Sequence, residues 1–369
     1  MKILMIHQGY EMYGSDKMFV QSADALRYDN PDNDIDIWIP KRGVLYDLFL
    51  KKGFNTEIKS LSILRKNIFI PFNLFNWIGF SNKLIVNIIN FIKLFKTYDI
   101  IYINTITIID AIIAARFVKR KKFIHVHEMP KGIMLKIFTC FLRLSRSKLI
   151  FISKAVSDTF SQASNNSALL LNGVPCINEY IVDFNKCNMR ILLIGRINSW
   201  KGHKLLLEAI SMLSIKILEE IELRIVGDVF EDQFFYKEEL EELVKNLELE
   251  KNVYFYSFSN TPADFYNWAN IVIVPSTSPE PFGLVAIEAM SIAKTVIVAN
   301  HGGLKEIVTN KLDGLTFKPN NVLDLVSKIE YLYFNKDEII KLGGEAKETF
   351  NSRFSEERYM FEFSNIILR

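Results

Sequence analysis

The sequence predicts an α/β protein made of two doubly wound domains. Short apolar, strand-like segments alternate with helix-like segments along the chain, and the alternation restarts after a polar stretch near residue 185. The length of 369 residues also exceeds what one hydrophobic core usually organises. We therefore expect a domain over residues 1–172, a linker over 173–188, a domain over 189–350 and a terminal segment over 351–369.

The first domain opens with the apolar strand Lys2–His7, followed by a loop with Gly9 and Gly14 and then by a helix. The next strands of this domain are expected at Ile35–Pro40, Ile100–Ile103, Phe123–His127, Leu149–Ile152 and Ala168–Leu171. Parallel sheets of this kind bind their ligands beyond the carboxyl ends of the strands.

The second domain follows Asn185–Asn188, which is polar and lacks apolar periodicity, as is typical of a linker. Its strands are expected at Arg190–Ile194, Leu223–Val226, Val253–Tyr256, Ile271–Val274, Thr295–Ala299 and Leu315–Phe317. A helix with a charged face is expected at Lys237–Leu247, and another from Phe282 or Gly283 to Met290. With two such domains, the expected ligand site is the cleft between them.

Charge is unevenly distributed over the two halves. Residues 1–185 hold 24 Lys and Arg against 15 Asp and Glu, whereas the remainder holds 21 against 27, for net charges of +9 and −6. The basic half suggests an anionic partner, and the alternative is chance surface composition. Segment 67–80 is apolar and aromatic with basic neighbours, which favours either a membrane interface or a buried loop and helix.

The three cysteines, Cys140, Cys176 and Cys187, are scattered and odd in number, so we expect no disulfide framework and no cysteine metal site. Cys140 lies in an apolar helical run and is expected in the core. The run Ile3–Ile6 is too short for a signal peptide, and no uncharged apolar stretch approaches the ~20 residues of a membrane span. These features favour a reducing cytosol.

The first chemical motif surrounds the strand Ile271–Val274. A loop at its carboxyl end leads to Glu280 and then to a helix whose first N–H groups, at Gly283 and Leu284, are suited to a diphosphate. Glu288 would lie about 8 Å further along that helix, given a rise of ~1.5 Å per residue. A carboxylate there can accept the two hydroxyl hydrogen bonds that a ribose offers.

The second motif runs from Gly195 to Gly202 after the first strand of the second domain. Its two glycines permit a tight backbone, and Arg196 and Lys201 bring two cations to the strand end. Such cations can neutralise a diphosphate leaving group. Taken alone, this pair is more typical of ordinary surface charges; together with Glu280 and Glu288 it indicates a ligand site.

These motifs resemble those of the large retaining GT-B glycosyltransferase family, numbered four in the usual classification. Its E-x7-E motif matches Glu280 and Glu288, and its Gly-Arg-x4-Lys-Gly motif matches Gly195 to Gly202. Two further motifs also match, at Asn172 to Val174 and at Gly302 to Val308. The resemblance covers nearly the whole chain and implies two Rossmann-like domains facing across a cleft.

The resemblance implies roles for individual residues. Arg196 and Lys201 would bind the donor diphosphate, Glu288 the ribose and Glu280 the transferred sugar. Backbone N–H groups would come from Phe282, Gly283 and Leu284, and Gly195 would lie in the same donor site. A glycine loop, here Tyr13 to Asp16, would lie over the donor with Gly14 and Ser15; Tyr13 replaces a glycine that is common in the family.

His127, followed by Glu128, matches a histidine that points into the family's cleft, and alternation places His125 on the same side of the strand. One of them would hydrogen-bond the donor sugar; the alternative is a structural histidine. Ala293 and Ser257 stand where glycine is usual. A final helix from Ser355 to Arg369 would cross back onto the first domain.

The implied reaction transfers a sugar from a UDP-, GDP- or dTDP-sugar with retention, by front-side attack, without a cofactor and without a divalent metal. The expected acceptor is a glycan or a polyprenyl-diphosphate-linked oligosaccharide, in the assembly of a surface polysaccharide such as O-antigen or capsule. We expect a cytoplasmic protein, peripheral on the inner face of the membrane, with no nucleic-acid partner. The alternatives are a GT-B sugar-nucleotide epimerase and a catalytically silent nucleotide-sugar-binding module.

Overall fold

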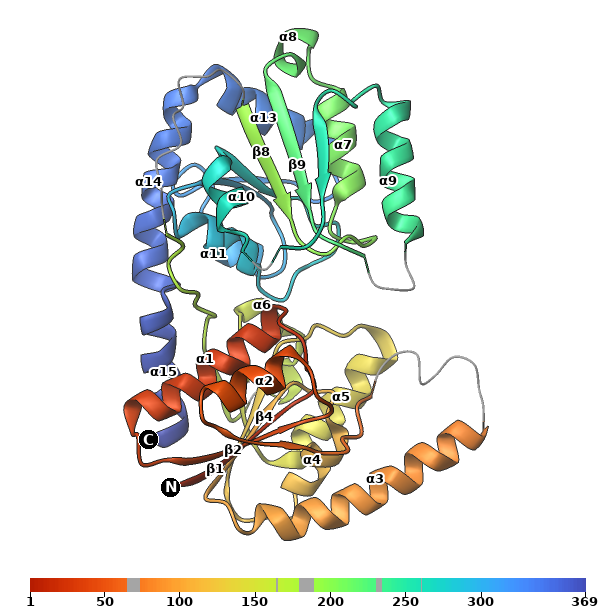
Figure 1. The fold of residues 1–369 in the computed structure, drawn as a ribbon, viewed down its shortest axis with the longest axis vertical. Helices are drawn as coiled ribbons and strands as arrows, with labels where there is room; N and C mark the ends of the chain where they lie inside the picture. The colour runs from red at the N-terminus through yellow and green to blue at the C-terminus, as the bar shows by residue number, and fades with distance from the viewer. Residues whose placement is uncertain (65–73, 164, 179–188, 230–233, 260) are drawn as a thin grey trace. The chain divides into compact units, whose positions relative to one another are not determined.

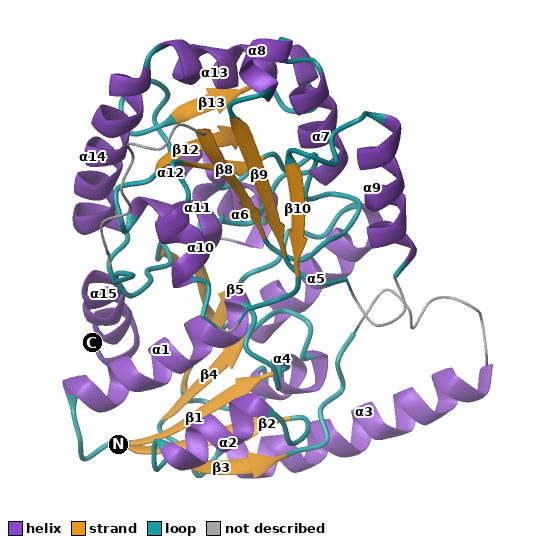
Figure 2. Cartoon of the chain, turned by 45° about the horizontal axis from the view of Figure 1, so that its top comes forward, coloured by secondary structure: helices purple, strands orange, loops and turns teal. Residues whose placement is uncertain are grey.

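The computed structural model describes residues 1–64, 74–163, 165–178, 189–229, 234–259 and 261–369. The chain divides into two compact units, Met1–Asn172 with Glu357–Arg369, and Gly173–Glu356. Each unit contains a parallel sheet with helices (Figure 1; Figure 2). Among the described residues, no helix has both the length and the apolar character needed to cross a membrane.

The sheet of the first unit has the order β3-β2-β1-β4-β5-β6-β7. Its strands are β1 (Lys2–His7), β2 (Asp34–Ile39), β3 (Asn55–Ile58), β4 (Ile100–Asn104), β5 (Lys121–Val126), β6 (Lys148–Phe151) and β7 (Ser167–Leu169). Strand order reverses beside β1, so β1 and β4 are neighbours although β2 and β3 lie between them along the chain. This is the switch point at which doubly wound sheets place their ligands.

The helices of the first unit are α1 (Gly14–Asp29), α2 (Val44–Lys51), α3 (Leu74–Phe95), α4 (Ile109–Ala115), α5 (Gly132–Ser145) and α6 (Lys154–Thr159), with a 3-10 turn at Ser161–Ala163. Helices α3, α4 and α5 pack in succession. The last helix of the chain, α15 (Glu356–Leu368), packs against α1: the Tyr359 hydroxyl lies 2.7 Å from Ser22 Oγ, and Ser364 Oγ donates to Ala25 O at 3.1 Å (Figure 1).

The sheet of the second unit has the order β10-β9-β8-β11-β12-β13, again parallel throughout. Its strands are β8 (Met189–Ile194), β9 (Ile221–Val226), β10 (Val253–Tyr256), β11 (Ile271–Val274), β12 (Thr295–Ala299) and β13 (Leu315–Phe317). Its helices are α7 (His203–Ser211), α8 (Ile215–Leu218), α9 (Phe235–Asn246), α10 (Ala263–Trp268), α11 (Leu284–Met290), α12 (Leu304–Ile307), α13 (Val322–Phe334) and α14 (Lys336–Arg353). Strands β11 and β12 are buried along their whole length, as expected for a sheet covered on both faces.

Several predictions of local structure were wrong. Strand β3 was missed because Asn55, Thr56 and Glu57 lack an apolar pattern at this sheet edge. The boundary at residue 350 falls inside α14, and the final helix begins at Glu356. Cys140 is exposed, because α5 buries Met134, Phe138 and Leu142 on its other side.

Two further predictions fall on parts that are not described. Residues 179–188 of the predicted linker lie outside the described residues. Of segment 67–80, residues 67–73 also lie outside them, and the remainder begins α3.

Candidate functional site

In the second unit, the predicted residues lie on two loops that follow the neighbouring strands β8 and β11. Gly195 directly follows β8 with φ +146°, a value that favours glycine. Gly202 starts α7 with φ +79°, and a Cβ there would lie 1.9 Å from Pro275 O. The loops are joined by a hydrogen bond from Thr277 N to Trp200 O at 2.8 Å. These constraints hold the loop that carries Arg196 and Lys201 against the end of β11.

Lys201 and Glu280 form an ion pair between these loops, with 2.8 Å between Lys201 Nζ and Glu280 Oε1. The Ser276 hydroxyl donates to the same carboxylate oxygen. The side chains of Lys201 and Glu280 are only 20% and 7% exposed, so water screens the pair little. Arg196 is partly exposed on the same loop as Lys201. Sequence reasoning did not identify Ser276, although its place in the loop after β11 was a usable signal.

Glu288 lies within α11 and has a different partner from Glu280. The Tyr266 hydroxyl of α10 donates to Glu288 Oε2 at 2.6 Å. Burial, followed by the Glu288 charge, raises the pKa of Tyr266, so this phenol stays protonated and keeps its donor role. The two acids of the E-x7-E motif are therefore held separately, one by a cation and one by a phenol. Tyr266 carried no signal in the sequence.

The segment between the two acids is constrained by close packing. Gly283 has φ +127°, and a Cβ there would lie 2.4 Å from Leu304 Cδ2. Phe282 is buried and packs edge to face with Phe354, so its ring takes part in the packing of the second unit. Leu284 is the first residue of α11, where helical N–H groups have no partner within the helix.

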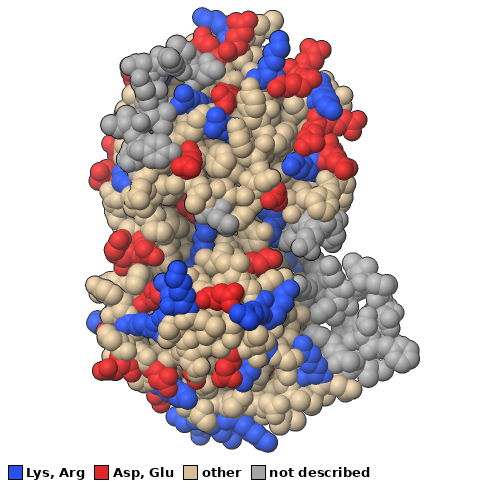
Figure 3. Space-filling model, viewed as in Figure 1, with Lys and Arg blue, Asp and Glu red and all other residues tan. Residues whose placement is uncertain are grey.

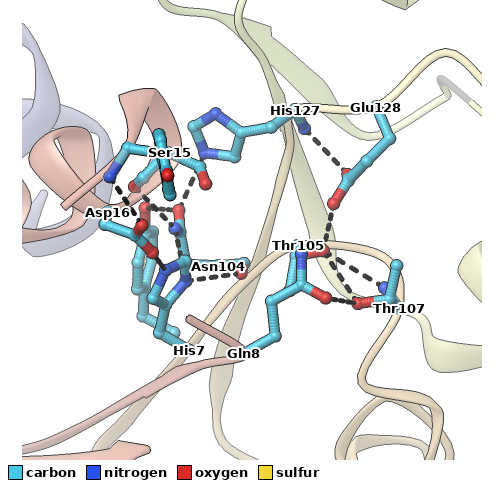
Figure 4. Close-up of polar contacts among 11 residues, drawn as sticks. His7, Gln8, Ser15, Asp16, Asn104, Thr105, Thr107, His127 and Glu128 are labelled. Carbon is cyan, nitrogen blue, oxygen red and sulfur yellow. Dashed lines mark hydrogen bonds and ion pairs between the residues drawn. The ribbon is translucent and has the colours of Figure 1, made fainter. Parts of the chain in front are cut away.

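In the first unit, Gly14 and Ser15 are the first two residues of α1, and His127 follows β5. Asn104, the last residue of β4, lies between them. Its Oδ1 is 2.8 Å from His127 Nε2, and its Nδ2 is 3.5 Å from Ser15 O. Figure 4 shows the His127 ring directed toward this group, with Glu128 turned away from it. The structure therefore brings His127, Gly14 and Ser15 together around an asparagine that sequence reasoning missed.

A buried histidine and an acid complete this group. His7 Nε2 lies 2.6 Å from Asp16 Oδ1, and His7 Nδ1 lies 2.9 Å from Asn104 Nδ2 (Figure 4). Tyr13 N donates to Asp16 Oδ2 at 2.9 Å, which caps α1 at the position where the family often has a second glycine. The strand-end rule that selected His127 would also have selected Asn104, which ends the adjacent strand.

Glu128 follows His127 but makes separate contacts. Its carboxylate accepts hydrogen bonds from the Thr105 hydroxyl, from Ile106 N at 3.4 Å and from His127 N at 3.1 Å. Burial raises the pKa of this carboxyl. Thr105 has φ +128°, a strained value for a β-branched residue, and such strain is concentrated at functional sites.

Parts of the chain are similar in sequence to known glycosyltransferases. Residues 181–349 match the family model described as glycosyl transferases group 1. An uncharacterized glycosyltransferase of Methanocaldococcus jannaschii is 30% identical over 62% of this chain and 62% of its own length. A lipopolysaccharide 1,2-N-acetylglucosaminetransferase of Salmonella typhimurium is 35% identical over 34% of this chain and 33% of its own length. The chain thus spans less than two thirds of these relatives.

Among solved structures, the Anabaena protein HepE in complex with UDP superposes with a TM-score of 0.83 at 21% identity, covering 99% of both chains. The same protein is also known in complex with UDP-glucose, at a TM-score of 0.81. Residues 181–349 are thus similar to the glycosyl transferases group 1 family, and the chain has the GT-B fold.

Proposed function

We propose that this protein is a retaining glycosyltransferase that uses a nucleoside diphosphate sugar and requires no divalent metal. In the proposed reaction, the bond from the sugar C1 to the diphosphate oxygen breaks while a bond from C1 to an acceptor hydroxyl oxygen forms on the same face. The hydroxyl proton passes to the departing diphosphate. No protein nucleophile is needed.

The observation that carries this proposal is the Lys201–Glu280 ion pair beside Arg196. A departing diphosphate gains negative charge, and fixed cations in a poorly hydrated site stabilise that charge more than water does. Glu280, held by Lys201 and Ser276, presents its carboxylate beside those cations, where a sugar hydroxyl can donate to it. Glu288, steadied by Tyr266, is the candidate partner of the ribose hydroxyls.

A donor panel tests this assignment. Thermal unfolding is measured with UDP-, GDP- and dTDP-sugars, because a bound donor raises the unfolding temperature by mass action. The stabilising donor is then incubated with a lipid-linked oligosaccharide in EDTA, and the product and its anomeric configuration are determined by mass spectrometry and NMR. Transfer with retention in EDTA is expected. Inversion, or transfer that EDTA abolishes, would contradict the proposal.

The same incubations separate two rivals. A sugar-nucleotide epimerase converts the donor with no acceptor present. A silent nucleotide-sugar-binding module is stabilised by the donor but gives neither transfer nor hydrolysis, and Glu280→Gln then changes no reaction rate.

We further propose that the acceptor is a lipid-linked glycan of a surface polysaccharide, such as O-antigen or capsule, met at the cytoplasmic face of a membrane. The support is helix α3, which is free of Asp and Glu. Ile85, Val86 and Ile89 are 56%, 56% and 50% exposed on it, and Lys83 and Lys93 are exposed too. In Figure 3 a group of basic side chains lies near the C-terminal end of α3, whereas acidic side chains gather over α9. An exposed apolar face flanked by lysines is suited to an anionic bilayer surface.

Vesicle flotation tests the membrane contact. Wild-type protein is expected to float with vesicles of anionic lipid and less with neutral vesicles, because the lysines add an electrostatic attraction. Replacing Ile85 and Ile89 by Asn should reduce flotation several-fold. Ile340→Asn is the matched control, since Ile340 is 72% exposed on α14, where acidic and basic neighbours are mixed. Equal flotation of the double variant and the wild type would overturn this part of the proposal.

A further inference from the structure

We propose that Asp16, His7 and Asn104 are positioning residues that hold His127 in one tautomer, with its proton on Nε2 and with Nδ1 as a hydrogen-bond acceptor. The inference rests on the proposed function only in assigning a sugar hydroxyl to that acceptor. The tautomer itself follows from the directions of the hydrogen bonds.

The direction of the hydrogen bonds is set at Asp16, because a carboxylate accepts hydrogen bonds and donates none. It accepts from Tyr13 N at 2.9 Å and faces His7 Nε2 at 2.6 Å. His7 therefore carries a proton on Nε2. Its ring is stacked on Phe19 at 4.7 Å between centroids and is fully buried, which fixes its orientation.

The next link is the Asn104 amide, whose orientation the Ser15 carbonyl determines. Asn104 Nδ2 lies 3.5 Å from Ser15 O and 2.9 Å from His7 Nδ1. A carbonyl oxygen can only accept, so the amide nitrogen is the atom that fits beside it. His7 Nδ1 then receives a proton from the amide and carries none. The backbone carbonyl oxygen of Asn104 lies farther from His7 Nδ1, at 3.2 Å.

The amide oxygen sets the remaining directions. Asn104 Oδ1 accepts from His127 Nε2 at 2.8 Å and from the Tyr102 hydroxyl at 3.0 Å. Because Tyr102 has used its one proton, His125 Nδ1 must donate to the Tyr102 oxygen, 2.6 Å away. Every donor in this chain of hydrogen bonds therefore points toward Asp16.

The neighbouring rings are neutral, so each carries a single proton. Burial lowers the pKa of His125 to about 3. Burial, and after it the proximity of the His125 and His7 rings, lowers the pKa of His127 well below its usual range. Two imidazoles with centroids 4.2 Å apart resist gaining charge together.

This tautomer determines which ligand groups His127 can bind. Within the described part of the chain no hydrogen bond reaches His127 Nδ1, and the residue is partly exposed. A bare nitrogen accepts from a hydroxyl but repels an ionised phosphate oxygen, which can only accept. His127 is thereby fitted to bind a sugar hydroxyl and unfitted to bind the diphosphate.

Long-range 1H–15N NMR of histidine-labelled full-length protein tests the tautomers, and five histidines make the assignment practicable. At neutral pH we expect the proton on Nε2 in His7 and His127, and on Nδ1 in His125. Asn104→Leu should leave His127 as a mixture of tautomers. Thr107→Val is the control, because Thr107 binds Gln8 at the same sheet edge outside the chain of hydrogen bonds, and it should change nothing.

If Asn104→Leu does not fold, Tyr102→Phe replaces it and should release the Nδ1 proton preference of His125 alone. A His127 ring protonated on Nδ1 or on both nitrogens in the wild type, or an unaltered ring in Asn104→Leu, would overturn the inference. The measurement needs no donor and no activity, so its outcome is independent of whether transfer is found.

Discussion

The two units present contrasting chemistry beyond their sheets. In the second unit an ion pair, Lys201–Glu280, joins the loops after β8 and β11. In the first unit the imidazoles of His125 and His127 and the Asn104 amide lie at the carboxyl ends of β5 and β4, and their hydrogen bonds lead through His7 to the buried carboxylate of Asp16. The two kinds of chemistry suit different ligand groups: a charged diphosphate requires cations, whereas sugar hydroxyls require neutral donors and acceptors.

The largest effect is expected from removing the Lys201–Glu280 ion pair of the second unit. Lys201→Met should lower kcat by about 10²–10³-fold, because a cation that stabilises the leaving diphosphate is lost. It should also reduce the free energy of unfolding by about 3 kcal/mol, since the Glu280 carboxylate, 7% exposed, is left without its cation. Steady-state kinetics and denaturant unfolding measure the two effects.

Glu280→Gln is the matched variant for Lys201→Met. It should destabilise the protein less, because Lys201 is more exposed than Glu280 and can reach water. A Lys201→Met enzyme with wild-type kcat would remove Lys201 from the proposed chemistry.

A second prediction concerns acid sensitivity, which the two units share. Burial lowers the pKa of His203 to about 3, as it does for His125. The folded state keeps this ring neutral while the unfolded state binds a proton near pH 6.5, so stability falls as pH drops below ~6.5. His203→Leu should reduce the stability lost between pH 7 and 5 by about 2 kcal/mol. Urea unfolding at both pH values measures it, and an unchanged pH dependence would contradict the burial argument.

The smallest effect concerns Glu288. Tyr266→Phe removes the hydroxyl that orients this carboxylate, and should weaken nucleoside diphosphate binding about five-fold, equivalent to about 1 kcal/mol. Calorimetric titration measures the change. Tyr254→Phe, which removes an exposed hydroxyl bonded to the Lys251 carbonyl, is the control and should bind as the wild type does. If the wild type, Tyr266→Phe and Tyr254→Phe bind the nucleoside diphosphate equally well, the hydrogen bond from Tyr266 to Glu288 does not contribute to binding.

The sequence predicted the two α/β sheets because buried parallel strands are continuous apolar runs. Five of the twelve predicted strands have the predicted bounds, among them Val253–Tyr256 and Thr295–Ala299. Strand Asn55–Ile58 escaped because an edge strand needs no such run. The sequence placed Lys201 and Glu280 in the same site but did not predict that they form an ion pair. The links through Asn104, Asp16 and Tyr266 depend on side-chain directions that tertiary packing sets, and no spacing in the sequence encodes them.

The most direct test of the account compares calorimetric affinities for a nucleoside diphosphate and for the matching nucleoside diphosphate sugar in three proteins. The account predicts that Lys201→Met weakens binding of both ligands. His127→Ala should leave the affinity for the nucleoside diphosphate unchanged, and should remove the additional affinity that the wild type has for the nucleoside diphosphate sugar. A His127→Ala protein that loses diphosphate affinity, or a Lys201→Met protein that keeps it, would contradict the assignment of charge recognition to one unit and hydroxyl recognition to the other.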